Sequence, residues 1–312
     1  PIKQEIAEQG HEGEITDLQF TPAARSWAGC WTASCTSTNS TGGEGHCEDN
    51  MKLPCGISVE TQGSPDHPAL IFLHGVGTDG TAWQPQLRAF ADEFRVIAWH
   101  MPGYADSEPR TPLTFSDLAT DLGNVLDELG IESAHVVGHS IGGMVAQQFA
   151  ASAPQRLRSL TLSATSPAFG KPDGEWQQEF VRKRLEPLEA GKTLADLAPK
   201  MVQDLTGDNP DPVGISLALH SIQAVSNTAF AAGVRCIVGF DRRDNLPNLT
   251  MPVLVLSGAQ DTNAPAPMME KMASKIPGAR YVCLEGVGHL GNLENPDAFN
   301  QTLRDFFATL KP

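Results

Sequence analysis

Short, nearly continuous apolar runs alternate with longer amphipathic stretches from Ala69 onwards. Buried parallel strands and their crossover helices produce this pattern. Strands are predicted over Ala69–Leu73, Arg95–Trp99, Ala134–Val137, Leu157–Ser163, Pro252–Ser257 and Ala279–Leu284. Helices are predicted over 115–129, where five Leu and Val residues share one helical face, and over 297–310. The pattern therefore predicts an α/β fold with a mostly parallel central sheet flanked by helices.

One interval, 166–245, interrupts the alternation. It contains no convincing central strand, but its apolar spacing predicts helices over Trp176–Leu188, Thr193–Asp204 and Val213–Val225. An insertion between two strands is the simplest explanation. We therefore predict a helical cap over 166–245, with the α/β core formed by 51–165 and 246–312.

Residues 1–50 form a predicted N-terminal extension, because they mix acidic residues with Gly, Ser and Thr and show little periodicity. Four of the six cysteines lie in one short stretch that begins in this extension and ends just after it: Cys30, Cys35, Cys47 and Cys55. Their spacing lacks the paired Cys-x-x-Cys elements of zinc sites. A disulfide would need an oxidising compartment, for which the N-terminus shows no signal. Unpaired thiols are the favoured interpretation, with a disulfide or a metal site as alternatives.

Composition and charge narrow the function classes. The 312 residues are 40% hydrophobic and 19% charged, which is ordinary for a packed globular protein. The net charge of -15 disfavours nucleic acid and anionic membranes as partners, because both attract Lys and Arg. Neither a membrane-spanning apolar run nor a signal-peptide pattern is apparent, so we expect a cytoplasmic protein that acts on a small molecule. The oligomeric state is not predicted.

The strongest chemical signal is the run Gly138-His139-Ser140-Ile141-Gly142-Gly143, which lies between a predicted strand and a helical pattern. In a Gly-x-Ser-x-Gly turn of this kind, the glycines allow a cramped backbone that exposes the serine. A phosphate-binding loop is the alternative, but the Gly-Lys-Ser/Thr ending of such loops is missing. Ser140 is therefore the predicted nucleophile.

A serine nucleophile requires a base, and the base requires a group that fixes its tautomer. Asp261 follows one predicted strand and His289 follows the next, both in glycine-containing loops. The order Ser, Asp, His is that of α/β enzymes rather than of other serine hydrolases. We predict His289 as general base and Asp261 as its orienting acid, with Asp244 and Glu285 as weaker acid candidates.

A glycine-containing turn, His74-Gly75-Val76-Gly77, directly follows the strand Ala69–Leu73. Such a turn can aim a backbone N–H at a substrate oxygen. The backbone N–H groups of Val76 and of Ile141, the residue after the nucleophile, are the predicted oxyanion hole. His74 is expected to support this loop rather than to react.

With these motifs in order, the sequence from Met51 to the C-terminus resembles the α/β-hydrolase superfamily. Within it, GHSIGGM at 138–144, TSPAFG at 165–170 and GHLGNLENP at 288–296 resemble the 3-oxoadipate enol-lactonases and related carboxylesterases. The resemblance implies the α/β-hydrolase fold and a hydrolase of a small carboxylic ester or lactone that needs no cofactor and no metal. His100 departs from the pattern, because relatives often carry an acid there.

The predicted reaction is attack of Ser140 on an ester or lactone carbonyl, followed by hydrolysis of the acyl-enzyme. Carbon–carbon bond hydrolysis of vinylogous diketones and cofactor-free perhydrolysis remain alternatives, and a non-enzymatic binding protein on the same scaffold is a third.

Substrate-pocket candidates are Trp83, Met144, Trp176 and His220. The acidic surface disfavours anionic substrates, although a local arginine could reverse this preference. The candidates for that role are Arg182, Arg184, Arg242 and Arg243.

Overall fold

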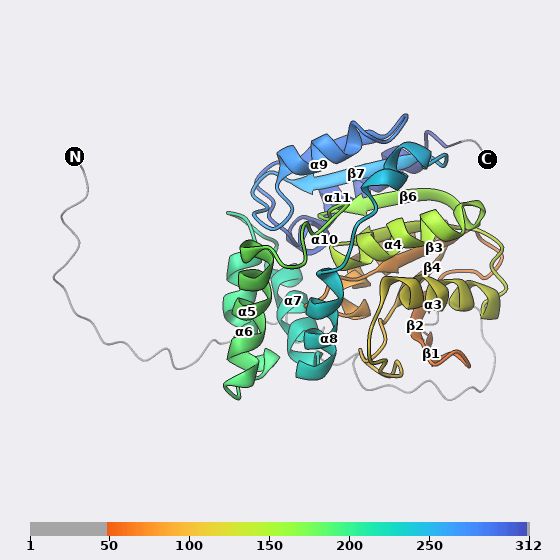
Figure 1. The fold of residues 1–312 in the computed structure, drawn as a ribbon. Coiled ribbons are helices and arrows are strands. Elements are labelled where there is room, and N and C mark those ends of the chain that lie inside the picture. Colours follow the sequence, from red (N-terminus) through yellow and green to blue (C-terminus); the bar gives the residue numbers. More distant parts are fainter. Residues whose placement is uncertain (1–48, 311–312) are drawn as a thin grey trace. The chain divides into compact units, whose positions relative to one another are not determined.

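The computed structural model describes residues 49–310 (Figure 1). Its strands are β1 Asp49–Lys52, β2 Ser58–Gln62, β3 Ala69–Leu73, β4 Arg95–Trp99, β5 Ala134–His139, β6 Leu157–Ser163, β7 Val253–Gly258 and β8 Arg280–Leu284. Most of the predicted extension, with Cys30, Cys35 and Cys47, lies outside the described residues. Asp49 and Asn50, its last two residues, belong to β1. Cys55 forms no disulfide with another described residue.

The eight strands form one sheet in the order β1-β2-β4-β3-β5-β6-β7-β8. β1 pairs with β2 and β2 with β4 in antiparallel register, whereas every pairing from β4 to β8 is parallel. The prediction of a mostly parallel sheet is therefore confirmed. Three of the six predicted parallel strands, β3, β4 and β6, have the predicted bounds.

Helices cover both faces of the sheet because alternate strand residues are apolar on both sides. In β3, Leu70 and Phe72 contribute to one apolar cluster, and Ile71 and Leu73 contribute to the other. The first cluster includes α2 (Gln84–Phe90) and α11 (Pro296–Phe307), and the second includes α3 (Phe115–Glu128) and α4 (Ile141–Ser152). The remaining helices of the core are α9 (Ala266–Ala273) and α10 (Gly291–Glu294), with 3-10 turns η1 (Gly80–Trp83), η2 (Pro154–Arg156) and η3 (Arg243–Asn248).

The winding of the sheet reverses next to β3. β4 follows β3 on one side, and β5 lies on its other side. Loops diverge where the winding reverses, so ligands of open α/β sheets bind beyond the carboxyl ends of the strands at this position. The loops after β3 and β5 carry Val76 and Ser140, which places two predicted site residues at this switch point.

Four helices occupy the segment predicted to be a cap: α5 (Glu175–Glu189), α6 (Leu194–Leu205), α7 (Pro212–Ala224) and α8 (Asn227–Ile237). Figure 1 shows them gathered beside the sheet rather than spread over its two faces. Three match predicted helices, but α8 was not predicted. Within 49–310, no helix is long and apolar enough to cross a membrane.

Candidate active site

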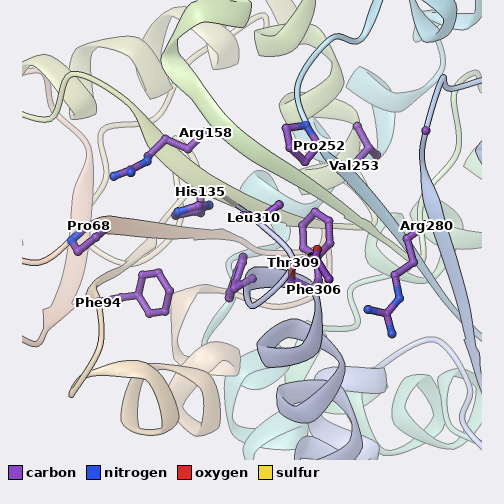
Figure 2. A pocket seen from close by; sticks show the side chains of 12 residues that line it. Pro68, Phe94, His135, Arg158, Pro252, Val253, Arg280, Phe306, Thr309 and Leu310 are labelled. Atoms are coloured by element: carbon purple, nitrogen blue, oxygen red, sulfur yellow. Dashed lines mark hydrogen bonds between the residues drawn. The ribbon is translucent and has the colours of Figure 1, made fainter. Parts of the chain in front are cut away.

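Two cavities identify the ends of the sheet. One, of about 620 Å³, is lined by residues near the amino ends of strands, including Pro68, Pro252 and Arg280, and by residues within 306–310, at and just after the end of α11. Figure 2 shows Arg158 and Arg280 on opposite sides of it. It contains none of the predicted catalytic residues. The other cavity, of about 870 Å³, lies at the carboxyl ends of the strands and is lined by Ser140 and His289.

Ser140 stands between the last residue of β5 and the first residue of α4. Its φ of 52° and ψ of -119° are sparsely populated for a residue with a side chain. The backbone around it is held by the Ser140 N–H donating to Ser163 O at 2.9 Å and by Thr165 Oγ1 donating to Ser140 O at 2.7 Å. This geometry projects the hydroxyl beyond the sheet and leaves it partly exposed at the cavity.

Two glycines are needed for this turn on steric grounds. A Cβ on Gly138 would lie 2.4 Å from Gly142 O, and a Cβ on Gly142 would lie 2.3 Å from Leu73 O. Contacts this short are not tolerated by backbone atoms. The glycines therefore allow α4 to start directly against the ends of β3 and β5.

Asp261 and His289 meet across two loops. His289 Nδ1 lies 2.7 Å from Asp261 Oδ2, and the Asp261 carboxylate is fully buried. Asp261 Oδ1 accepts the backbone N–H groups of Asn263 at 2.8 Å and Ala264 at 3.0 Å. Burial acts to raise the pKa of Asp261, but the charge and hydrogen bond of His289, with these two N–H donors, hold it below its usual value. The carboxylate is thus ionised at neutral pH and fixes the ring nitrogen that it faces.

The ring of His139 packs against His289, with 4.9 Å between ring centroids. Burial lowers the pKa of His139 to about 3, and the neighbouring His289 contributes in the same direction. His139 is therefore neutral, and its ring forms an uncharged wall beside the imidazole of His289.

The loop after β3 presents Val76 to the same cavity. Within residues 49–310, the backbone N–H groups of Val76 and Ile141 donate to no backbone acceptor. Ile141 is the first residue of α4, where unpaired N–H groups and the helix dipole favour negative charge. The predicted oxyanion donors are thus both available.

His74 supports this loop, as its sequence position suggested. Its Nδ1 lies 2.8 Å from Gly75 O, and its Nε2 accepts the Met101 N–H at 2.9 Å. Nδ1 therefore carries the proton and donates to Gly75 O. Burial lowers the pKa of His74 to about 4, so the ring stays neutral.

Comparison with known proteins identifies the family of the chain. The sequence profile described as "alpha/beta hydrolase fold" matches residues 68–296, well over half of the chain. The chain belongs to the α/β-hydrolase family. The predicted fold and the predicted resemblance are both confirmed.

The relatives of this α/β-hydrolase include enzymes named for lactone and ester hydrolysis. It is 29% identical to 3-oxoadipate enol-lactonase 1 of Acinetobacter baylyi over 82% of this chain and 94% of the relative. It is similar to the malate-bound thermophilic esterase of Thermogutta terrifontis (26% identity, TM-score 0.75, 85% and 100% of the two chains covered). The enol-lactonase of Burkholderia xenovorans LB400 gives 28% identity and a TM-score of 0.69, with 83% and 100% covered.

The pocket predictions for this α/β-hydrolase are corrected in part. Met144 and Trp176 line the cavity, although Trp176 remains 61% exposed at its edge. Trp83 does not line it, because its ring is buried against Phe72 on the other face of the sheet, with 4.7 Å between ring centroids. His220 is exposed on α7 and does not line it either.

The weaker acid candidates are not part of this site. Asp244 and Glu285 are exposed, and neither lines the cavity. His100, the departure from the family pattern, is buried. Its Nδ1 accepts the Gly80 N–H at 3.2 Å, and its Nε2 lies 3.3 Å from Glu60 Oε1. These contacts indicate a structural role for His100 just after the end of β4.

Sequence reasoning did not single out Arg184 among its arginine candidates, and it missed Glu294. Arg184 on α5 lines the cavity and was only one of four equivalent arginines in the sequence. Glu294 on α10 is buried beside the His289 loop and was not selected at all. Its position five residues after His289 was the available signal, because this spacing returns a helical turn towards the loop that precedes it.

Proposed function

We propose that this α/β-hydrolase cleaves a carboxylic ester or lactone through an acyl-enzyme formed on Ser140. The observation that carries the proposal is the buried Asp261–His289 pair, 2.7 Å apart, on the cavity that Ser140 also lines. A carboxylate on Nδ1 leaves the other ring nitrogen, Nε2, free to accept a proton. This is the tautomer that a general base for a serine hydroxyl requires.

In the proposed reaction, Ser140 Oγ attacks the carbonyl carbon while His289 Nε2 takes the hydroxyl proton. The N–H groups of Val76 and Ile141 stabilise the oxyanion, an effect worth roughly 3 kcal/mol per donor. The imidazolium then protonates the alcohol oxygen as the carbon–oxygen bond breaks. Water, deprotonated by His289, cleaves the acyl-enzyme and releases the acid. Asp261 stays ionised throughout and stabilises the imidazolium.

The proposal is tested with Ser140→Ala and a fluorophosphonate probe. We expect the native enzyme to be labelled at Ser140 and to hydrolyse members of a panel of 4-nitrophenyl esters and lactones. Ser140→Ala should be unlabelled and lose at least about 10³-fold in kcat on its best substrate. Retention of near-normal turnover by Ser140→Ala would show that the proposal is wrong.

Arg184 supports a substrate that carries a carboxylate. Its guanidinium lies 3.4 Å from the centroid of the Phe180 ring, and it donates to Phe180 O and Asn263 Oδ1 at 3.3 Å each. It has no carboxylate partner within residues 49–310, whereas Arg182 pairs with Glu179 and Glu186. Burial lowers the pKa of Arg184 to about 10, so it remains cationic at neutral pH.

The other candidate arginines do not fit this role. Arg243 pairs with Asp241, Arg242 donates to Asp241 O, and neither lines the cavity. Lys183 and Lys200 also line the cavity, but Lys183 pairs with Glu179 and Lys200 pairs with Asp204. A lining cation without an acidic partner among the described residues suits a substrate anion, in spite of the overall negative charge. We therefore assign the substrate a carboxylate that Arg184 binds.

A further inference from the structure

A second buried carboxylate, that of Glu294, brackets His289. Glu294 is 3% exposed and is the last residue of α10. Its Oε2 accepts the Gly288 N–H at 2.9 Å, and its Oε1 accepts the Leu290 N–H at 2.8 Å. Gly288 and Leu290 are the two chain neighbours of His289. One carboxylate therefore fixes the peptide planes on both sides of the predicted base.

The same carboxylate ties this loop to the helical insertion. Glu294 Oε2 also accepts the N–H of Gly207, which lies just after α6, at 2.6 Å. The N–H of His289 itself donates to Leu205 O, the last carbonyl of α6, at 2.6 Å. All three consecutive N–H groups of the loop, 288 to 290, are thus bound by Glu294 or by the end of α6.

The chain just after α6 packs tightly against the loop that carries His289. A Cβ on Gly207 would lie 2.3 Å from Gly286 O and 2.5 Å from Gln260 Oε1. Gln260 precedes Asp261, and its side-chain oxygen accepts the N–H of Asp208 at 2.8 Å. The chain after α6 therefore touches both loops that carry the proposed acid and base. Because packed interiors transmit small displacements, a shift of α6 moves these loops with it.

The charge of Glu294 has no Lys or Arg partner within residues 49–310. Burial raises its pKa, while the three N–H donors and the nearby charge of His289 act in the opposite direction. A carboxylate buried in this way is costly unless its hydrogen bonds are satisfied. The negative charge of Glu294 and the positive charge of a protonated His289 attract each other, so in the proposed reaction Glu294 helps to stabilise the imidazolium.

We propose that Glu294 is a positioning residue that fastens the His289 loop to the end of α6, so that the helical insertion holds the imidazole in its reactive orientation. This inference rests on the proposed function of His289 as general base. It extends that function, because it makes the insertion part of the catalytic geometry and not only a lining of the substrate cavity.

Two substitutions test the proposal from opposite sides of the contact. Glu294→Gln keeps the shape of the side chain but removes its charge and one acceptor oxygen. Gly207→Ala keeps the charge of Glu294 and adds a methyl group to the chain after α6. The new carbon would lie 2.3 Å from Gly286 O, in the loop that carries His289. Neither changes Ser140, Asp261 or His289.

Each substitution has a matched control elsewhere in the chain. Asp121→Asn alters another buried carboxylate, which lies on α3 and pairs with Arg110 at 2.7 Å. Gly239→Ala adds a methyl group where nothing lies within 4 Å of the new atom. For all four variants, kcat and KM are measured on the best substrate of the panel. The rate of fluorophosphonate labelling and the urea unfolding midpoint are measured as well.

We expect both test variants to lose about 10- to 100-fold in kcat, with KM changed less than threefold, because misplacing a reacting group by about 1 Å has an effect of this size. Labelling by the probe should slow in parallel, since it uses the same base. Glu294→Gln should also shift the acid limb of the kcat/KM profile to lower pH, because it removes negative charge near the imidazolium. Gly207→Ala should leave that limb unmoved.

The controls should keep kcat within twofold, even where Asp121→Asn lowers the unfolding midpoint. A kcat within threefold of the native value in either correctly folded test variant would overturn the positioning role. So would an equal loss in Asp121→Asn. The Ser140→Ala variant separates the two failures. Native-like activity of Ser140→Ala would reject the proposed function, and with it the role of His289 as base. Loss of activity in Ser140→Ala together with unaffected test variants rejects only the role of Glu294.

Discussion

The replacement Asp261→Asn tests the tautomer argument most directly. Asp261 Oδ1 accepts two backbone N–H groups, and Oδ2 faces His289 Nδ1 at 2.7 Å. An asparagine amide has only one oxygen. Turning its NH2 group towards Asn263 and Ala264 would leave two buried donors unsatisfied, at a cost of about 1–3 kcal/mol each. The amide oxygen therefore stays with these donors, and the NH2 group faces His289.

This orientation puts a donor against Nδ1, which must then be unprotonated. The ring proton moves to Nε2, which can no longer accept the proton of Ser140. In a serine protease with a Ser-His-Asp triad, the equivalent change lowers kcat by about 10⁴-fold. With 1.36 kcal/mol for each factor of ten, we expect a loss of about 10³- to 10⁴-fold here, or roughly 4–5.5 kcal/mol in the activation barrier.

The assay is the initial rate of hydrolysis of a chromogenic ester at neutral pH, with the native fold confirmed by circular dichroism. Glu285→Gln is the matched control, because Glu285 is an exposed acid on the His289 loop and does not line the cavity. It should retain native kcat. A kcat for Asp261→Asn within tenfold of the native enzyme would refute the tautomer argument and the role of Asp261.

Two further predictions concern Arg184 and acid stability. Arg184→Gln should raise KM about 10- to 100-fold for an ester bearing a carboxylate and leave the matched neutral ester unchanged, since a hydrogen bond to a charged group contributes about 1.5–3 kcal/mol; Arg182→Gln is the control, and equal effects on both esters would contradict the assignment. His135 has its pKa lowered to about 4 by burial and by Arg158, so the unfolded chain binds its proton near pH 6.5 while the folded chain does not. Stability should therefore fall as pH drops from about 6.5 towards 4, and His135 should contribute about 2 kcal/mol of this loss at pH 5. The free energy of unfolding in urea at pH 7 and pH 5 checks this, with His135→Gln expected to show the smaller difference; an undiminished difference would count against it.

The sequence by itself determined the fold class and the loops that carry the proposed chemistry. Strands buried on both faces are continuous apolar runs, so β3, β4 and β6 were bounded correctly from local composition. Gly138 is required by a contact within its own strand-to-helix turn, with Gly142 O, so this part of the glycine pattern is local, whereas Gly142 is required by the approach of Leu73 O from β3. Chain order then placed Asp261 and His289 after the last two strands.

Tertiary structure decided everything that depends on residues distant in sequence. Trp83 and Met144 are both apolar and near site motifs, yet only packing sends Trp83 to the opposite face of the sheet. Four arginines were equivalent in the sequence, and the ion pairs and the path of α5 single out Arg184. Two partners of Glu294 lie in the loop just before it, but the third, Gly207, lies 87 residues earlier, so no periodicity could reveal that contact. Local sequence patterns indicate which backbone conformation a strand, turn or helix adopts. The partners of a buried charge depend instead on how the helical insertion packs against the sheet.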